Sequence, residues 1–235
     1  MLIIGHRGGA GLEPENTLAS LRAGIAAGAD MLEFDIRLTK DKVPVLAHDF
    51  HLYHTHKSSK FISSLTLKEL QKMTAKSDNP IATLDEAMQE CYGKVLLAIE
   101  LKQTNMFEHA LPVLEKYIKR KTDWQSVLFL SFKPRALRRV RKLAPHAQLA
   151  LTHSLNPFLF VGHVRPLALT AVGFHRLRVD RFAVELAKQL GLFTYVYTVN
   201  RPDAAFRLAE RGIDGIVTDR PDLLMSDKRL KRKRA

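Results

Sequence analysis

Short apolar runs recur along this chain of 235 residues, and amphipathic stretches separate most of them. Runs that are apolar throughout are typical of parallel strands with both faces buried. Eight such runs that alternate with helices predict an α/β fold, a closed (β/α)8 barrel of the TIM type. The predicted strands are residues 2–4, 31–36, 94–99, 126–130, 148–151, 169–174, 192–199 and 215–217. An open doubly wound sheet is the alternative, but the glycines after the first run lack the Gly-x-Gly-x-x-Gly spacing of its dinucleotide-binding form.

The amphipathic stretches predict helices between the strands. One begins after Thr17 and is closed by Gly28 in a C-cap position, and others cover 105–119, 134–143, 180–190 and 202–211.

Residues 43–47 break the alternation, because they follow the second strand too closely to start a new barrel unit. They predict a hairpin return beside that strand. The next segment, about 49–66, is polar and predicts a small insertion over the carboxyl face of the barrel. Two helical pieces, 67–73 and 84–91, lead back to the third barrel strand.

The positive charge is concentrated at the carboxyl end. The net charge is +13, and Lys or Arg occupies six of the last eight positions. A run of this kind is typical of a solvated tail that attracts anionic surfaces. We therefore expect a catalytic barrel over residues 1–226 and a basic, disordered tail over 227–235 that makes at most weak contact with an anionic membrane. No nucleic acid partner is expected, although a basic RNA- or membrane-binding module stays a remote alternative.

A single cysteine, Cys91, excludes an internal disulfide and any metal site built from several cysteines. Its helical spacing from Leu84 and Met88 predicts a core position. The chain starts on a strand without a secretory signal, and it lacks the roughly 18 continuous apolar residues of a membrane span. A cytoplasmic protein is expected, and its oligomeric state is left open.

Charged residues stand where four of the apolar runs end. These clusters are His6-Arg7, Glu33-Phe34-Asp35, His48-Asp49 and Glu100-Leu101-Lys102. An unpaired charge at the end of a buried strand costs several kcal/mol unless it meets a counter-ion, a metal or a ligand. We therefore expect the four clusters to meet one another at the barrel mouth.

Side chains alternate along a strand, so Glu33 and Asp35 point the same way, and so do Glu100 and Lys102. In a barrel both pairs would point inward at the mouth. Three carboxylates that converge on one point repel each other unless a cation lies between them. Hard oxygen ligands suit Mg²⁺ or Ca²⁺. The competing interpretation is a salt-bridge network with Arg7, Arg37 or Lys102.

His6 and His48 lie on different predicted strand ends and can serve as general acid and general base. The other eight histidines are interpreted as surface, loop or packing residues, with His175 as the main exception. Arg7 and Lys102 add fixed positive charge that favours an oxyanion such as phosphate. Phosphoryl transfer fits better than acyl transfer, since no Gly-x-Ser-x-Gly motif occurs.

An ordered set of motifs from Gly5 to about Leu224 resembles the glycerophosphodiester phosphodiesterase family. The motifs are His6-Arg7-Gly8, Pro14-Glu15-Asn16-Thr17, Gly28-Ala29-Asp30-Met31-Leu32-Glu33-Phe34-Asp35, Thr39-Lys40-Asp41, His48-Asp49, Glu100-Leu101-Lys102, Thr198-Val199-Asn200 and residues 212–221. Each motif is weak alone, but the ordered set is highly specific.

This resemblance implies metal-dependent hydrolysis of glycerophosphodiesters to sn-glycerol 3-phosphate and an alcohol. By position it makes Glu33, Asp35 and Glu100 the ligands of Mg²⁺ or Ca²⁺. His6 and His48 become the acid and base, in an order that the sequence does not decide, and Arg7 and Lys102 hold the phosphate. The implied route is attack of the glycerol 2-hydroxyl on phosphorus, which gives a cyclic phosphate that water opens.

Two departures from the family pattern bear on substrate choice. Tyr197 stands where many members carry tryptophan, and His54 to His56 replace the usual arginine and threonine. An alternative function is a lysophospholipase D, with the basic tail and Phe158-Leu159-Phe160 docked at a membrane. The role of Asp49 stays open between orienting His48 and capping a turn.

Overall fold

The computed structural model describes residues 1–77, 80–153 and 155–232, with side chains up to Leu230. Its strands are β1 Leu2–Gly5, β2 Met31–Leu38, β3 Pro44–Leu46, β4 Leu96–Leu101, β5 Val127–Ser131, β6 Gln148–His153, β7 Ala171–His175, β8 Phe193–Tyr197 and β9 Gly215–Thr218. Its α-helices are α1 Leu18–Ala26, α2 Tyr53–His56, α3 Leu67–Thr74, α4 Leu84–Cys91, α5 Phe107–Leu114, α6 Pro134–Leu143, α7 Val164–Leu167, α8 Arg181–Gln189, α9 Pro202–Glu210, α10 Pro221–Ser226 and α11 Lys228–Arg232. Short 3₁₀ turns lie at η1 Ile62–Ser64, η2 Lys121–Ser126 and η3 Val161–His163.

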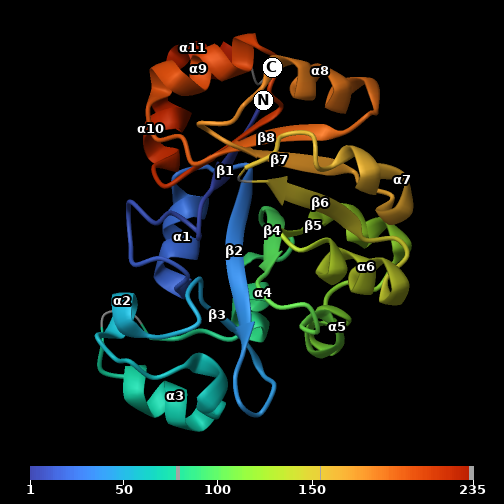
Figure 1. Cartoon of the computed structure of the whole chain (residues 1–235). Coiled ribbons are helices and arrows are strands. Elements are labelled where there is room, and N and C mark those ends of the chain that lie inside the picture. The colour runs from blue at the N-terminus through green and yellow to red at the C-terminus, as the bar shows by residue number, and fades with distance from the viewer. Residues whose placement is uncertain (78–79, 154, 233–235) are drawn as a thin grey trace.

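The eight parallel strands other than β3 close into a barrel, because β1 pairs with β2 on one side and with β9 on the other. Helices cover the outside (Figure 1). This confirms the predicted (β/α)8 fold and excludes the open sheet. Apolar side chains inside the barrel form one core cluster, and a larger cluster fills the space between strands and helices.

The expected hairpin is present, since β3 pairs antiparallel with the end of β2. This pairing extends β2 to Leu38, two residues beyond the predicted strand. The insertion that follows carries α2 and η1. It buries its own small apolar cluster, which includes Leu52, Ile62 and Leu70. Because Leu70 belongs to α3, the compact unit continues past residue 66, the predicted end of the insertion.

Two local predictions agree with the structure, and one differs from it. Gly28 ends α1 with a φ of 81°, and Cys91 is fully buried. The tail that was expected to be disordered starts with α11, which packs on α9 and α10. Leu230 explains the difference, because its apolar side chain is buried in the main core. Residues 233–235 of the expected tail lie outside the described part of the chain.

Candidate active site

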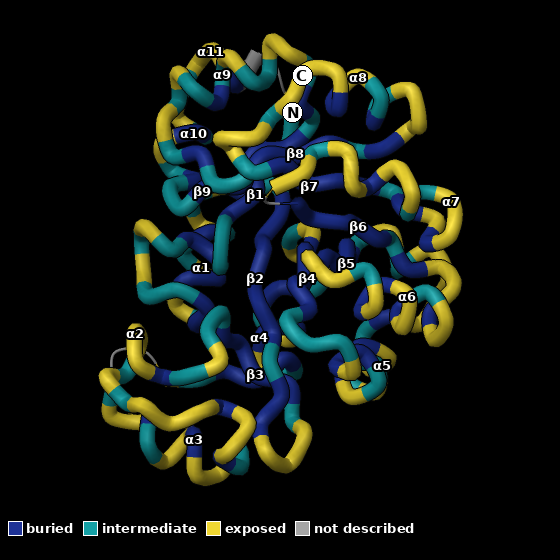
Figure 2. The backbone as a smooth tube through the Cα atoms, in the orientation of Figure 1, coloured by how far each residue is buried: buried dark blue, intermediate teal, exposed yellow. Residues whose placement is uncertain are grey.

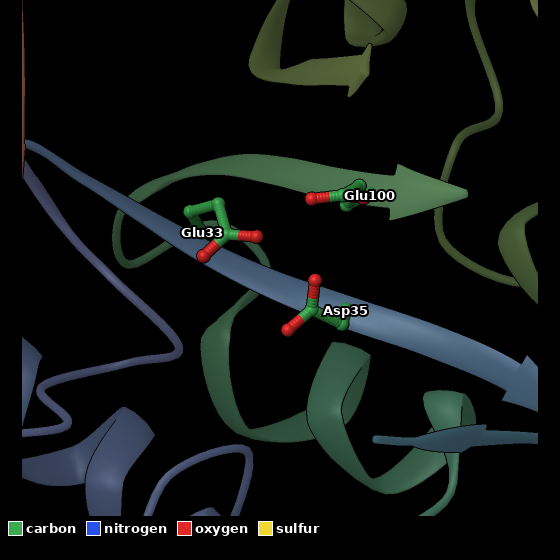
Figure 3. A group of neighbouring side chains, drawn as sticks. All are labelled: Glu33, Asp35 and Glu100. Atoms are coloured by element: carbon green, nitrogen blue, oxygen red, sulfur yellow. The ribbon is translucent and has the colours of Figure 1, made fainter. Parts of the chain in front are cut away.

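Three carboxylates meet near the mouth of the barrel. Glu33 and Asp35 project from the same face of β2, and Glu100 projects from β4, where it lies opposite Asp35 in the strand register. Figure 3 shows the three side chains pointing toward one another. Ligand oxygens from the three residues lie within 4.8 Å of each other, and all three residues are buried. The expected convergence of the acids is therefore present.

Cations and an amide surround this acidic cluster. The Lys102 ammonium lies 2.8 Å from Asp35 Oδ1 and 2.6 Å from Glu100 Oε1. Asn16 donates from its side-chain amide to Asp35 Oδ2 and accepts from the Asp35 backbone N–H. Arg7 binds both carboxylate oxygens of Glu15 and lies 3.6 Å from Asp35 Oδ2. Part of the competing salt-bridge interpretation is thus also correct.

These surroundings give the three carboxyl groups different pKa values. Burial raises the pKa of Asp35, but the charges of Lys102 and Arg7 outweigh it and hold the pKa well below its usual range. Burial and the neighbouring Asp35 charge raise the pKa of Glu33 to about 7 and the pKa of Glu100 to about 8. An added positive charge would therefore stabilise the ionised forms of Glu33 and Glu100 most.

A tight turn after β1 places the first histidine and the arginine. Arg7 and Gly8 both have positive φ, and a Cβ on Gly8 would lie 2.6 Å from the Ser20 side-chain oxygen. This turn points the Arg7 backbone N–H at Glu33 Oε2, 2.9 Å away. The glycine of the His-Arg-Gly motif is therefore required by the backbone.

His6 is held by a carboxylate from the opposite end of the chain. Its Nδ1 lies 2.5 Å from Asp219 Oδ1, and Asn200 donates to the other oxygen of Asp219. Burial lowers the pKa of His6, but the bond to Asp219 and the charge of Glu33 outweigh it and raise the pKa above its ordinary value. Because Asp219 contacts the Nδ1 atom of His6, the Nε2 atom is the one available to exchange a proton with a ligand.

His48 has a carboxylate partner of its own, since its Nδ1 lies 2.8 Å from Asp49 Oδ1. Its backbone carbonyl accepts a hydrogen bond from Arg37 Nε. Burial lowers the pKa of His48, which favours the neutral imidazole. Of the two roles left open for Asp49, orienting the histidine is the one that the contact supports.

A cavity of about 290 Å³ connects these groups. Six of the seven predicted site residues line it, and Asp35 lies beneath them. The opposite wall is formed by β5 to β8 and carries Phe132, Thr152, His175, Arg176 and Tyr197. The Tyr197 ring contacts the rings of Phe132 and His175, with centroids 5.9 and 5.6 Å apart. His175, the expected exception among the other histidines, thus lines the cavity.

The donor set fits a hard divalent cation. Three buried carboxylates supply only oxygen ligands, and two of them have raised pKa values that a cation would reverse. Glu33, Asp35 and Glu100 are the residues that would hold it.

Sequence reasoning gave no role to several residues that support the site. Asp219 and Asn200 hold His6, while Glu15 and Asn16 hold Arg7 and Asp35. All four belong to the sequence motifs named above. Neither the spacing of those motifs nor strand periodicity indicates which side chains they contact.

Comparison with known proteins agrees with the geometry. The model of the glycerophosphoryl diester phosphodiesterase family matches residues 6–223. The chain belongs to this family. It is 31% identical to a glycerophosphodiester phosphodiesterase of Caldanaerobacter subterraneus, with 96% of each chain covered. The membership confirms the expected enzyme class, a phosphoric diester hydrolase.

Solved structures of similar proteins share the fold. A phosphodiesterase from Oleispira antarctica, solved in complex with the product sn-glycerol-3-phosphate, has a TM-score of 0.87 at 27% identity, with 96% of each chain covered. A glycerophosphodiester phosphodiesterase from Thermotoga maritima has a TM-score of 0.81 at 26% identity over 95% of this chain and 96% of its own. Within the described residues, no helix is both long and apolar enough to cross a membrane.

Proposed function

We propose that this chain hydrolyses glycerophosphodiesters to sn-glycerol 3-phosphate and an alcohol in a reaction that requires Mg²⁺ or Ca²⁺. The observation that carries the proposal is the meeting of three buried carboxylates and two histidines at one cavity. The product complex of the Oleispira antarctica phosphodiesterase, a structural neighbour, supports the choice of product.

The bound cation would neutralise the acidic cluster and stabilise negative charge on the phosphoryl oxygens. Arg7 and Lys102 face the same cavity and add positive charge that binds and orients the phosphate. Each of these two side chains also lies against Asp35, so their positions depend on the acidic cluster. The phosphate site is therefore built around the acidic cluster.

His6 and His48 serve as the acid and base. One accepts the proton of the glycerol 2-hydroxyl as its oxygen bonds to phosphorus, and the other donates a proton to the alcohol whose bond to phosphorus breaks. Water then opens the cyclic phosphate, and the two histidines exchange roles. Their separate carboxylate partners, Asp219 and Asp49, support two independent proton-transfer groups.

The test is a hydrolysis assay with glycerophosphocholine and glycerophosphoethanolamine, each with Mg²⁺ or Ca²⁺. We expect His6→Ala and His48→Ala to lower kcat by about 10²–10⁴-fold, because each loses a proton-transfer group. Exhaustive chelation should also abolish the reaction. His146→Ala is the matched control, since that histidine is exposed and does not line the cavity. Full activity in His6→Ala or after chelation would reject the mechanism.

The lysophospholipase D alternative is separated by comparing rates on lysophosphatidylcholine and glycerophosphocholine. Two exposed side chains near the mouth, Phe158 and Leu159, favour keeping this candidate. A large excess of activity on the lysolipid would replace the main proposal.

A further inference from the structure

Large apolar side chains stand exposed on the segments that follow β6 and β7, up to the first turn of α8. Leu155 and Leu177 are each 76% exposed, and Phe182 is 80% exposed. We name this surface the β6/β7 rim, and its members are Leu155, Phe158, Leu159, Val161, Leu177 and Phe182. Exposed apolar groups gathered on two neighbouring segments indicate a surface that meets a partner.

The rim borders the cavity. β6 and β7 pair in parallel, with His153 opposite Phe174, so both loops leave the barrel at the same edge. Thr152 of β6 and His175 of β7 line the cavity just before these loops begin. Figure 2 shows the segment between β6 and α7 as an exposed stretch beside β7.

The loop after β6 is anchored, although much of it is exposed. Phe160 is fully buried, and its ring contacts those of Phe174 and His153, with centroids 6.1 and 6.3 Å apart. Only Phe160 of the Phe158-Leu159-Phe160 trio therefore packs in the core. Phe158 and Leu159 directly precede this fixed anchor, so their exposure is a feature of the fold.

Arginines are interleaved with the apolar side chains of the rim. Arg176, Arg178 and Arg181 are exposed, and none of them has an ion-pair partner within the described residues. The carboxylate between them, Asp180, caps α8 by accepting from the backbone N–H groups of Phe182 and Ala183. The segment from Arg176 to Phe182 therefore carries a net charge of two positive units, three arginines less one aspartate.

We propose that the β6/β7 rim docks on an anionic lipid surface. Apolar side chains that enter the headgroup region, with arginines beside anionic headgroups, match the chemistry of such an interface. A second copy of the chain is a poorer fit, because a symmetric contact would bring the same arginines against each other. Docking here would turn the barrel mouth toward the lipid headgroups. The proposal assigns membrane contact to the rim and not to the tail, and it does not depend on the hydrolytic reaction.

The test is co-sedimentation of the full chain with vesicles, without substrate. We expect binding to vesicles that contain phosphatidylglycerol and weak binding to pure phosphatidylcholine. Leu177→Ser should weaken binding, while Leu190→Ser should not, because Leu190 is exposed at the opposite end of α8. Arg178→Gln with Arg181→Gln should weaken binding by about fivefold per arginine. The matched charge control is Arg138→Gln with Lys142→Gln on α6.

Three results would overturn the proposal: no vesicle binding, equal losses in the control variants, or a dimer in sedimentation velocity that Leu177→Ser dissociates. Hydrolysis of soluble glycerophosphocholine is measured on the same samples. If the unsubstituted chain hydrolyses glycerophosphocholine but does not bind vesicles, the rim proposal alone is rejected. If it binds vesicles but does not hydrolyse the substrate, only the proposed reaction is rejected.

Discussion

The two walls of the cavity are built differently. The wall from β1, β2 and β4 is a buried network in which carboxylates pair with cations and an amide. The wall from β5 to β8 is lined by aromatic rings that contact one another, and it leads to the exposed rim. The first arrangement fixes charges for chemistry, and the second offers surface for recognition.

Two histidines, His6 and His153, show the same contrast. His6, on the charged wall, has Asp219 as its partner and a raised pKa. His153, at the end of β6, has no partner for its Nε2 atom within the described residues, and burial lowers its pKa to about 4. The same side chain is thus prepared for protonation on one side of the barrel and kept neutral on the other.

The largest effect is expected on the charged wall. Glu100→Gln should remove a ligand of the divalent cation and lower kcat by about 10³-fold, since the cation supplies several kcal/mol. At a free concentration of about 100 times its Kd, Mg²⁺ or Ca²⁺ should raise the free energy of unfolding of the wild-type chain by about 2.7 kcal/mol. This gain should disappear in Glu100→Gln. Thermal unfolding with and without metal measures it. The exposed Glu115→Gln is the control, and an unchanged metal response in Glu100→Gln would contradict the ligand assignment.

His153 predicts a pH dependence of stability. Burial lowers its pKa from the ordinary value of 6.5 to about 4 in the folded chain, so between these two pH values the unfolded chain binds the extra proton. The free energy of unfolding should therefore fall as the pH drops from 6.5 toward 4, by up to about 3 kcal/mol. His153→Leu should flatten this slope, while the exposed His146→Leu should leave it unchanged. Urea unfolding at several pH values measures it, and equal slopes in both variants would refute the assignment.

Asp219→Asn tests the carboxylate that holds His6. A hydrogen bond to a charged group is worth about 1.5–3 kcal/mol, so kcat should fall by roughly 10- to 150-fold. Loss of the negative charge should also lower the pKa of His6, because the bond to Asp219 raises it. The limb of the pH–rate profile that reports His6 should move to lower pH. A fall in kcat with no movement of either limb would show that Asp219 only supports the fold.

The convergence of the carboxylates could be predicted from the sequence, because side chains alternate along a strand. Glu33 and Asp35 are two residues apart on a strand, so any buried strand places them on one face. The parallel pairing of β4 with β2 then brings Glu100 beside Asp35, as the alternation of strands and helices predicts. The fold and the acidic cluster are therefore the parts of the molecule most directly encoded by spacing.

The side chains that contact the site residues could not be predicted in the same way. Asp219 meets His6 across 213 positions of sequence, and Glu15 meets Arg7 through a loop whose shape depends on a left-handed turn. Periodicity carries no information about such contacts. The helix at the start of the tail was missed for a related reason, since one apolar residue, Leu230, determines its packing amid a run of cations.

The smallest effect is expected on the aromatic wall. The Tyr197 hydroxyl donates to the backbone carbonyl of His153 over 2.6 Å, so it is already occupied within the protein. Tyr197→Phe keeps the ring beside Phe132 and His175 and should cost about 0.5–1.5 kcal/mol of stability. Because the hydroxyl contacts no reacting group, kcat should stay near the wild-type value, with any change confined to KM. Steady-state kinetics on glycerophosphocholine measures both constants. A fall in kcat as large as that of Asp219→Asn would mean that the aromatic wall takes part in the chemistry and that the two walls do not divide the work.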